Sequence, residues 1–437
     1  MSTSTGSPLT LATAPSKVPD KRFSAAARLD PYWGGVWHPG ASARWLSRTG
    51  AERLADMGLG DLPAAFTARS REQAMEEILS HNRPSRLSAL GAVGMWRTLT
   101  SEQLAALVGR ASLATQRSVD ADVLWASGLV DRGHFHSSLR NAAGVRLYRP
   151  ERTGDFDALS TKLPYTDWVG VTGGVGWKWG NQFDRHNVLA AELGLRAAEY
   201  TDIACVLGES MSGIAHLSGA LNCDLAVSSS RAADGLFVRE DGMLVAIEIS
   251  ASVTSNLREK IEHWIEVLVA DKSKRLTVLF VECAHPDFAS SNGEVHRQLR
   301  KMVAKQAHGS MATALAEVPE RMLLTRWTDW FPGAGRVTTE FLGLGAVRPT
   351  GQQGNRWEKV SLLDPFAFPF DGGDPSRESA VLNQCRSLFG VPHWMRTPSL
   401  DYSAIVRVNA GVTATPKLPY WRDYTPSGDS DETAVPA

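Results

Sequence analysis

Between residues 184 and 282, apolar positions alternate between helix-like and strand-like spacing. Asp184–Tyr200 and Ser255–Ala270 each predict a helix, the second with a clear apolar stripe at three- and four-residue spacing. Ile203–Leu207 and Arg275–Glu282 are short, mostly apolar runs that predict buried strands. Alternating helices and strands of this kind predict an α/β domain.

A hairpin is expected between the first of these strands and the second helix. Two apolar runs, Leu236–Val238 and Met243–Ile249, flank a polar Arg-Glu-Asp-Gly turn at residues 239–242. A three-residue loop with Gly242 in the left-handed conformation is slightly favoured, and a two-residue loop is the alternative.

The length of this loop decides where two acidic residues lie. The three-residue loop places Asp234 opposite Glu248, whereas the two-residue loop puts them on opposite faces of the sheet. Like charges that face each other destabilise a sheet, so the facing pair requires a counter-charge. A divalent cation with oxygen ligands is the economical candidate. The longer loop therefore predicts a metal site at Asp234 and Glu248.

A second compact pattern of helices and a strand precedes this domain. A first helix begins after Thr100 and ends at Gly109, and a second is expected from Ser112 to about Ser127. A strand follows at residues 144–149. The order LTSEQLAALVG, SGLVDRG and GVRLYRP resembles winged helix-turn-helix domains, in which the second helix of the motif enters the major groove.

This resemblance implies base contacts from the start of the second helix and phosphate contacts from the wing. The implied DNA-binding residues are Ser112, Thr115, Gln116, Arg117, Arg140 and Arg146. A helical wheel that turns Ala114, Ala121 and Leu124 inward also turns Arg117 partly inward, where an apolar residue is expected. The alternative is a winged helix that binds a protein and never touches DNA.

Charge and composition narrow the class of protein. Net charge is −1, but residues 83–149 hold nine arginines, no lysine and four acids, a local balance of 9 − 4 = +5 that suits a DNA reader. No apolar run approaches the roughly 18 residues of a membrane span, and the N-terminus lacks a signal-peptide core. The four cysteines show no close pairing, which excludes a zinc ribbon and fits a reducing, cytoplasmic location.

The sequence ADGLFVREDGMLVAIEIS resembles the central hairpin of the PD-(D/E)xK nuclease superfamily. This resemblance implies that Asp234 and Glu248 bind Mg²⁺ and are catalytic, and Glu192 and Glu209 are candidate additional acids. A lysine belongs two positions after the second acid, where it would stabilise the attacking hydroxide and the developing phosphorane charge. Ser250 stands there instead.

Lys260 is the candidate replacement for that lysine. It lies beside Trp264 at the edge of the apolar stripe of the second helix, so its ammonium could return to the sheet. A lysine that extends into solvent is an equal alternative. A Lys260 nitrogen about 4 Å from the facing acids would favour catalysis.

The order of the winged-helix pattern, RHNVLAAELGLRA, GES, ADGLFV, AIEIS and REKIEHW is similar to the replication-relaxation family of actinobacterial plasmids, integrative elements and phages. It implies an accessory role in plasmid or mobile-element replication or mobilisation.

We therefore expect a multidomain α+β and α/β protein: a winged helix-turn-helix, then a PD-(D/E)xK-like αβββαβ core, then a loop-rich C-terminal extension. The expected parts are a disordered tail (1–25), an N-terminal helical segment (26–83), the winged helix (84–155), the nuclease-like domain (180–330), the extension (331–424) and a disordered acidic tail (425–437). Residues 161–180 are expected to form a linker or an ordered loop.

Three functions follow as hypotheses. The first is a DNA-binding accessory protein with a degenerate nuclease-like core, favoured slightly because of Ser250. The second is an active Mg²⁺-dependent endonuclease or nickase that uses Asp234, Glu248 and Lys260, with Mg²⁺ as cofactor only if the site is intact. The third is a winged-helix transcription regulator. Double-stranded DNA is the expected partner, with a replication or mobilisation protein and a homodimer as further options and no membrane partner.

Overall fold

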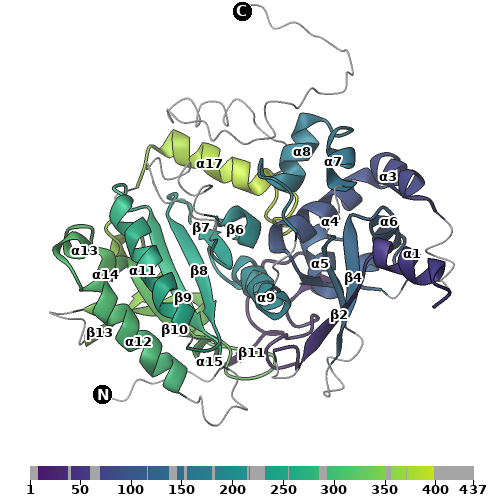
Figure 1. Cartoon of the computed structure of the whole chain (residues 1–437). Helices are drawn as coiled ribbons and strands as arrows, with labels where there is room; N and C mark the ends of the chain where they lie inside the picture. The colour runs from purple at the N-terminus through teal and green to yellow at the C-terminus, as the bar shows by residue number, and fades with distance from the viewer. Residues whose placement is uncertain are drawn as a thin grey trace, which may run out of the picture.

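The computed structural model describes residues 8–37, 41–59, 69–115, 117–136, 145–151, 155–179, 183–213, 216, 232–253, 255–284, 293–350, 356–370 and 372–397. Within these ranges the protein is a mixed α/β structure with a seven-stranded sheet, a four-stranded sheet and a two-stranded sheet (Figure 1). Among the helices of these ranges, none combines the length and the apolar composition that crossing a lipid bilayer demands.

The large sheet has seven strands. In spatial order they are β13 (Arg356–Ser361), β12 (Gly345–Thr350), β10 (Met322–Arg326), β9 (Leu276–Glu282), β8 (Leu244–Ser250), β7 (Gly235–Val238) and β6 (Cys205–Gly208). Strands β8, β9 and β10 are parallel to one another, and the neighbours at both ends of the sheet pair antiparallel. Strands β8 and β9 are buried along their whole length, which explains why their sequences are apolar on both faces.

Helices cover this sheet. α9 (Asp184–Tyr200) packs against β6 and β7, α11 (Ser255–Ala270) against β9, and α12 (Glu294–Ala307) against β10 and α11. The chain order α9, β6, β7, β8, α11, β9 is the helix–strand–hairpin–helix–strand order that the apolar pattern predicts. The shorter helices are α13 (Met311–Leu315), α14 (Val318–Arg321), α15 (Trp327–Trp330), α16 (Thr339–Leu342) and α17 (Pro375–Ser387).

The N-terminal half forms a helical group with its own small sheet. Its helices are α1 (Arg48–Asp56), α3 (Arg71–Ser80), α4 (Arg83–Trp96), α5 (Ser101–Val108), α6 (Val119–Ala126), α7 (Asp155–Ser160) and α8 (Tyr165–Thr172). The small sheet has the order β2 (Ser42–Leu46), β4 (Val130–His136), β5 (Arg146–Pro150), β3 (Leu99–Thr100). α5 begins with a capping box between Thr100 and Gln103 and ends at Gly109, whose φ of +80° suits glycine.

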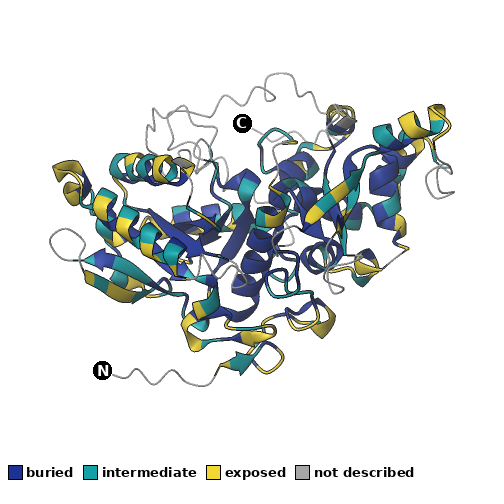
Figure 2. Ribbon diagram, turned by 60° about the horizontal axis from the view of Figure 1, so that its bottom comes forward, coloured by how far each residue is buried: buried dark blue, intermediate teal, exposed yellow. Residues whose placement is uncertain are grey.

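The two halves share one hydrophobic core. α9 contacts α4 and α5 on one side and strands β6 and β7 on the other. Trp96 of α4 is fully buried against α9, and a Cβ at Gly194 would lie 2.4 Å from its ring. Buried residues therefore extend through the large sheet, α9 and the helices around α4 (Figure 2).

The second helix of the helix-turn-helix pattern is not continuous, so that prediction is wrong. A 3-10 turn at Ala111–Ala114 is followed by α6, which starts after the capping residue Ser118. The break leaves Arg117 exposed and not partly inward, so no charge has to face the core. Ala114, expected inward, is exposed, and Leu113 is buried in its place.

Three broader expectations also need correction. Residues 8–25 are packed and not disordered, because Leu11, Val18 and Phe23 enter the core and β1 (Leu9–Thr10) pairs with β11 (Arg336–Val337). The supposed linker at 161–180 contains α8, which ends at Gly173. The loop-rich extension supplies β12 and β13, so the large sheet continues beyond residue 330. Residues 398–437, including the acidic tail, lie outside the described residues.

Candidate active site

The β7–β8 hairpin brings together Asp234 and Glu248, which form an acid pair. Arg239 N donates to Met243 O at 3.0 Å, which closes the three-residue loop, and Gly242 has a φ of +87°. Gly235 pairs with Ile247 at the end of the ladder, and Asp234 N donates to Ile247 O at 2.9 Å, so Asp234 lies directly beyond the last pair and close to Glu248. The backbone of Ile249 also donates to Asp234 Oδ2 at 2.7 Å. The predicted three-residue loop is confirmed, together with the register that it sets as far as Gly235 opposite Ile247.

Lys260 supplies positive charge to this pair from α11. Its Nζ contacts Glu248 Oε2 and lies 3.9 Å from Asp234 Oδ2. The Glu248 side chain is 1% exposed, whereas those of Asp234 and Lys260 are 18% and 31% exposed. The side chain turns back to the sheet because its neighbours Ile261 and Trp264 are buried in the interface between α11 and the sheet. The counter-charge is thus a lysine in the described structure.

Trp264 holds the other oxygen of Glu248. Its Nε1 donates to Glu248 Oε1 at 2.6 Å, and the indole is 2% exposed. Burial raises the pKa of the Glu248 carboxyl to about 7, Lys260 acts in the opposite direction, and the nearby Asp234 adds to the increase. Sequence reasoning missed Trp264 as a partner, although its place four residues after Lys260 put both on one helix face.

Glu209 lies at the edge of this cluster. It starts the 3-10 turn after β6, accepts a 2.5 Å hydrogen bond from Asn187 Nδ2, and has Arg97 Nε at 4.0 Å. Burial raises its pKa, Arg97 opposes the shift, and Asp234 is close enough to add to it. Within the described residues, however, no three His, Cys, Asp or Glu side chains converge as a metal cluster would require. The carboxylates that the site presents to a cation are therefore two, those of Asp234 and Glu248.

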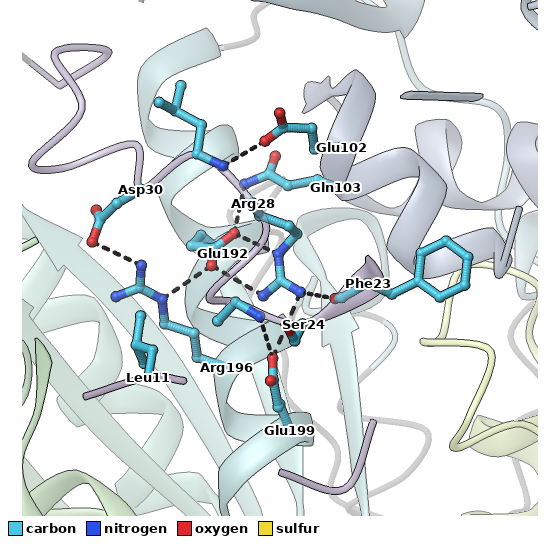
Figure 3. A network of polar contacts seen from close by, with 12 residues as sticks. Leu11, Phe23, Ser24, Arg28, Asp30, Glu102, Gln103, Glu192, Arg196 and Glu199 are labelled. Atoms are coloured by element: carbon cyan, nitrogen blue, oxygen red, sulfur yellow. Dashed lines mark hydrogen bonds and ion pairs between the residues drawn. The ribbon is translucent and has the colours of Figure 1, made fainter. Parts of the chain in front are cut away.

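Glu192, the other acid considered, lies in a separate buried network (Figure 3). Its Oε1 is 3.0 Å from both Arg28 Nη2 and Arg196 Nε, and Arg196 Nη2 is 2.9 Å from Asp30 Oδ2. Burial would raise the pKa of Glu192, but Arg28 and Arg196 together lower it. Glu199, two α9 turns further on, accepts from Ala25 N at 2.7 Å. Through this network the N-terminal segment is bound to α9. Because Glu192 is paired there, it does not take part in the acid pair of Asp234 and Glu248.

Two further residues near the site are Trp37, from the N-terminal segment, and His186, from α9. Trp37 Nε1 donates to Cys283 O at 2.7 Å, and its ring meets His186 edge to face at 5.0 Å. Burial lowers the pKa of His186, and both Asp234 and Lys260 are close enough to act on it. A neutral imidazole therefore lies beside the acid pair.

The residues implied in DNA binding are placed unevenly. Ser112, Thr115 and Arg117 are exposed around the break before α6, and Arg146 Nη1 donates to Thr115 O at 2.9 Å. Gln116 and Arg140 lie outside the described residues. α6 itself is mostly buried, with Asp120 and Asp122 in its first turn. These acids disfavour phosphate contact from that helix end.

The local excess of arginine is largely compensated inside the fold. Six of the nine arginines between residues 83 and 149 lie within 4.0 Å of an acid, and they are Arg83, Arg86, Arg97, Arg110, Arg132 and Arg149. The two acids of the first turn of α6 take three of these six arginines. Three of the paired acids are already counted in the balance of +5, and the pairs of Arg83 with Asp167 and of Arg97 with Glu209 lower it to 5 − 2 = +3.

No protein family, curated protein or solved structure matches this chain.

Proposed function

We propose that this protein binds DNA and hydrolyses its phosphodiester bonds at Asp234, Glu248 and Lys260 with a divalent cation. The observation that carries the proposal is the position of the Lys260 ammonium, 3.9 Å from Asp234 and in contact with Glu248. Although Ser250 occupies the expected place, a lysine reaches the facing acids from the next helix. Titratable side chains that gather around a buried carboxylate with a raised pKa are typical of catalytic sites.

The two acids offer a fit for Mg²⁺. Among the described residues no hydrogen bond engages Asp234 Oδ1, and Glu248 Oε2 faces the same side as Asp234. Two carboxylates with water in the remaining positions are typical of Mg²⁺ in proteins. Bound there, the ion would polarise the scissile phosphate and lower the pKa of a water molecule.

The chain's own groups would do the rest. Lys260 would hold the attacking hydroxide by hydrogen bonding and offset the negative charge that develops on the phosphate. Trp264 would keep Glu248 oriented, since the indole N–H occupies Oε1 and leaves Oε2 facing Asp234. The buried surroundings strengthen both effects by excluding water.

The N-terminal half supports DNA binding by its topology. Helix α4, strand β3, helices α5 and α6 and the antiparallel strands β4 and β5 follow the order of a winged helix, with β2 as an added edge strand. Phe135 and Leu147 of the wing strands form a small core with Val188 of α9 and Val36. The proposed wing thus lies against the helix that borders the acid pair, so one DNA could contact both.

The second candidate is a DNA-binding accessory protein of plasmid or mobile-element replication whose core no longer cleaves. It is favoured by Ser250 and by the contact of Lys260 with Glu248, because an ammonium in that position already neutralises a carboxylate that a cation needs. The resemblance to the replication-relaxation family implies this same accessory role.

Incubation of the full chain with supercoiled plasmid and Mg²⁺ or Mn²⁺ separates the two. We expect nicked or linear product that disappears in Asp234→Ala, with Glu76→Gln on the exposed side of α3 as the matched control. Absence of cleavage by the wild-type chain, together with absence of Mn²⁺ binding by calorimetry, would reject catalysis and favour the accessory function.

A further inference from the structure

We infer that the acid pair is served by a docking rim for single-stranded nucleic acid, formed by Trp179 and Phe183 with the cations Lys178 and Arg185. This inference rests on the proposed function, since it names the substrate class of the same site. Trp179 is 47% exposed and Phe183 is 74% exposed. The two aromatic side chains lie four positions apart with exposed cations beside them, and this combination offers flat apolar faces and positive charge to one ligand.

Contacts on two sides join the rim to His186 and to Glu209, at the edge of the acid pair. Phe183 lies 6.1 Å from His186, ring centre to ring centre, and His186 is the imidazole on which Asp234 and Lys260 act. On the other side, Arg97 donates to Lys178 O and has its Nε 4.0 Å from Glu209.

The rim also approaches the strand that carries the first acid. Lys178 Nζ lies 3.8 Å from the position of a Cβ on Gly213, and Gly213 pairs with Ala232, two residues before Asp234. The chain segments that carry the two exposed rings therefore both lie next to residues at the edge of the acid pair.

The chemistry of this rim favours unpaired bases. Aromatic side chains stack on bases of any sequence, and neighbouring cations follow the phosphate backbone. A base in a duplex is already stacked and cannot use such a surface without being extruded. The site should therefore take a single strand, an unpaired flap or a melted segment in preference to an intact duplex.

Fluorescence anisotropy with a labelled 20-nucleotide dT strand and a duplex of equal length tests this in EDTA, where no cleavage can occur. We expect the double variant Trp179→Ala, Phe183→Ala to bind the strand at least tenfold more weakly and the duplex within about twofold of wild type. Phe366→Ala, which removes a 94% exposed ring elsewhere, is the matched control and should bind both as wild type does. Trp179→Phe with Phe183→Tyr, which retains stacking, should restore most of the affinity.

The outcomes distinguish this inference from the proposed function. The inference would be overturned if the double variant lost strand binding and duplex binding equally, or lost neither. The inference would also be overturned if anionic vesicles or another protein protected the fluorescence of Trp179 from an added quencher and the dT strand did not. Asp234→Ala should bind the strand at wild-type affinity, so a failure of cleavage with intact, rim-dependent binding would count against the nuclease proposal alone.

Discussion

Lys260 shows how a single side chain can restore a charge arrangement that linear spacing lacks. The motif position after Glu248 holds Ser250, yet the ammonium reaches the carboxylates from α11 because the helix packs on the sheet. The distance in space, and not the spacing in sequence, determines the electrostatics of the site.

Replacement of Lys260 with methionine should destabilise the protein in a pH-dependent way. Without the ammonium, Glu248 would be buried beside Asp234 with no cation, at a cost of about 1–3 kcal/mol where the carboxyl is ionised, less than for a fully buried pair because Lys260 is 31% exposed. The cost should vanish near pH 5, because Glu248 is protonated below its pKa of about 7. Urea denaturation at pH 5 and pH 8 measures it, with Lys272→Met on an exposed loop as control.

The raised pKa of Glu248 also predicts the pH dependence of metal binding. A cation must displace the proton, so the affinity for Mn²⁺ should rise up to tenfold per pH unit below pH 7 and level off above it. Calorimetry at pH 6 in buffers of different ionisation enthalpy should detect about one released proton. A pH-independent affinity would show that the cation does not bind through Glu248.

At the scale of elements, the hairpin loop decides whether the site exists. Gly242 combines a φ of +87° with a close approach to α17, since an added Cβ would lie 1.9 Å from Glu378 Oε2. Glu378 forms a buried ion pair with Arg275, which directly precedes β9, so the loop is fixed from outside. The three-residue loop that turns both acids to one face is therefore held by tertiary contacts as well as by its own geometry.

Gly242→Ala should cost about 2–4 kcal/mol, which combines the left-handed backbone penalty with displacement of Glu378. Gly335→Ala is the matched control: its φ is +66° but nothing lies within 4 Å, so only the backbone penalty of about 1–2 kcal/mol applies. Chemical denaturation compares the two. Equal losses would mean that the contact with Glu378 does not hold the loop.

At the scale of the whole molecule, α9 unites parts that are far apart in sequence. It carries the network to Arg28 and Asp30, packs against α4 and α5, and borders the acid pair with His186 and Asn187. The molecule is therefore built as one packed unit around this helix, and the N-terminal segment belongs to its core.

Glu192 and Glu209, the two acids outside the acid pair, therefore contribute differently to the stability of the protein. Glu192→Gln should cost roughly 3–5 kcal/mol because Arg28 and Arg196 would remain buried with one shared carboxylate fewer. It should also expose residues 8–30 to proteolysis. Glu209→Gln should change the free energy of unfolding by less than about 1 kcal/mol, because its partner Asn187 can still donate. Stability curves and limited trypsin digestion check both.

The sequence by itself determined the features that depend on neighbours along the chain. Apolar spacing predicted α9 and α11 with the bounds that the structure has, and the turn sequence predicted the three-residue loop and the register that pairs Gly235 with Ile247. Local periodicity and turn chemistry carry that information directly.

Only the tertiary structure decided the features that depend on distant partners. The ammonium beside the acids, the place of Glu192 in another network, the packing of residues 8–25 and the addition of β12 and β13 all involve contacts across many residues. The break before α6 belongs here too, because Asp120 is buried against Arg86 of α4. Such contacts follow from burial and charge pairing in three dimensions, which no local pattern specifies.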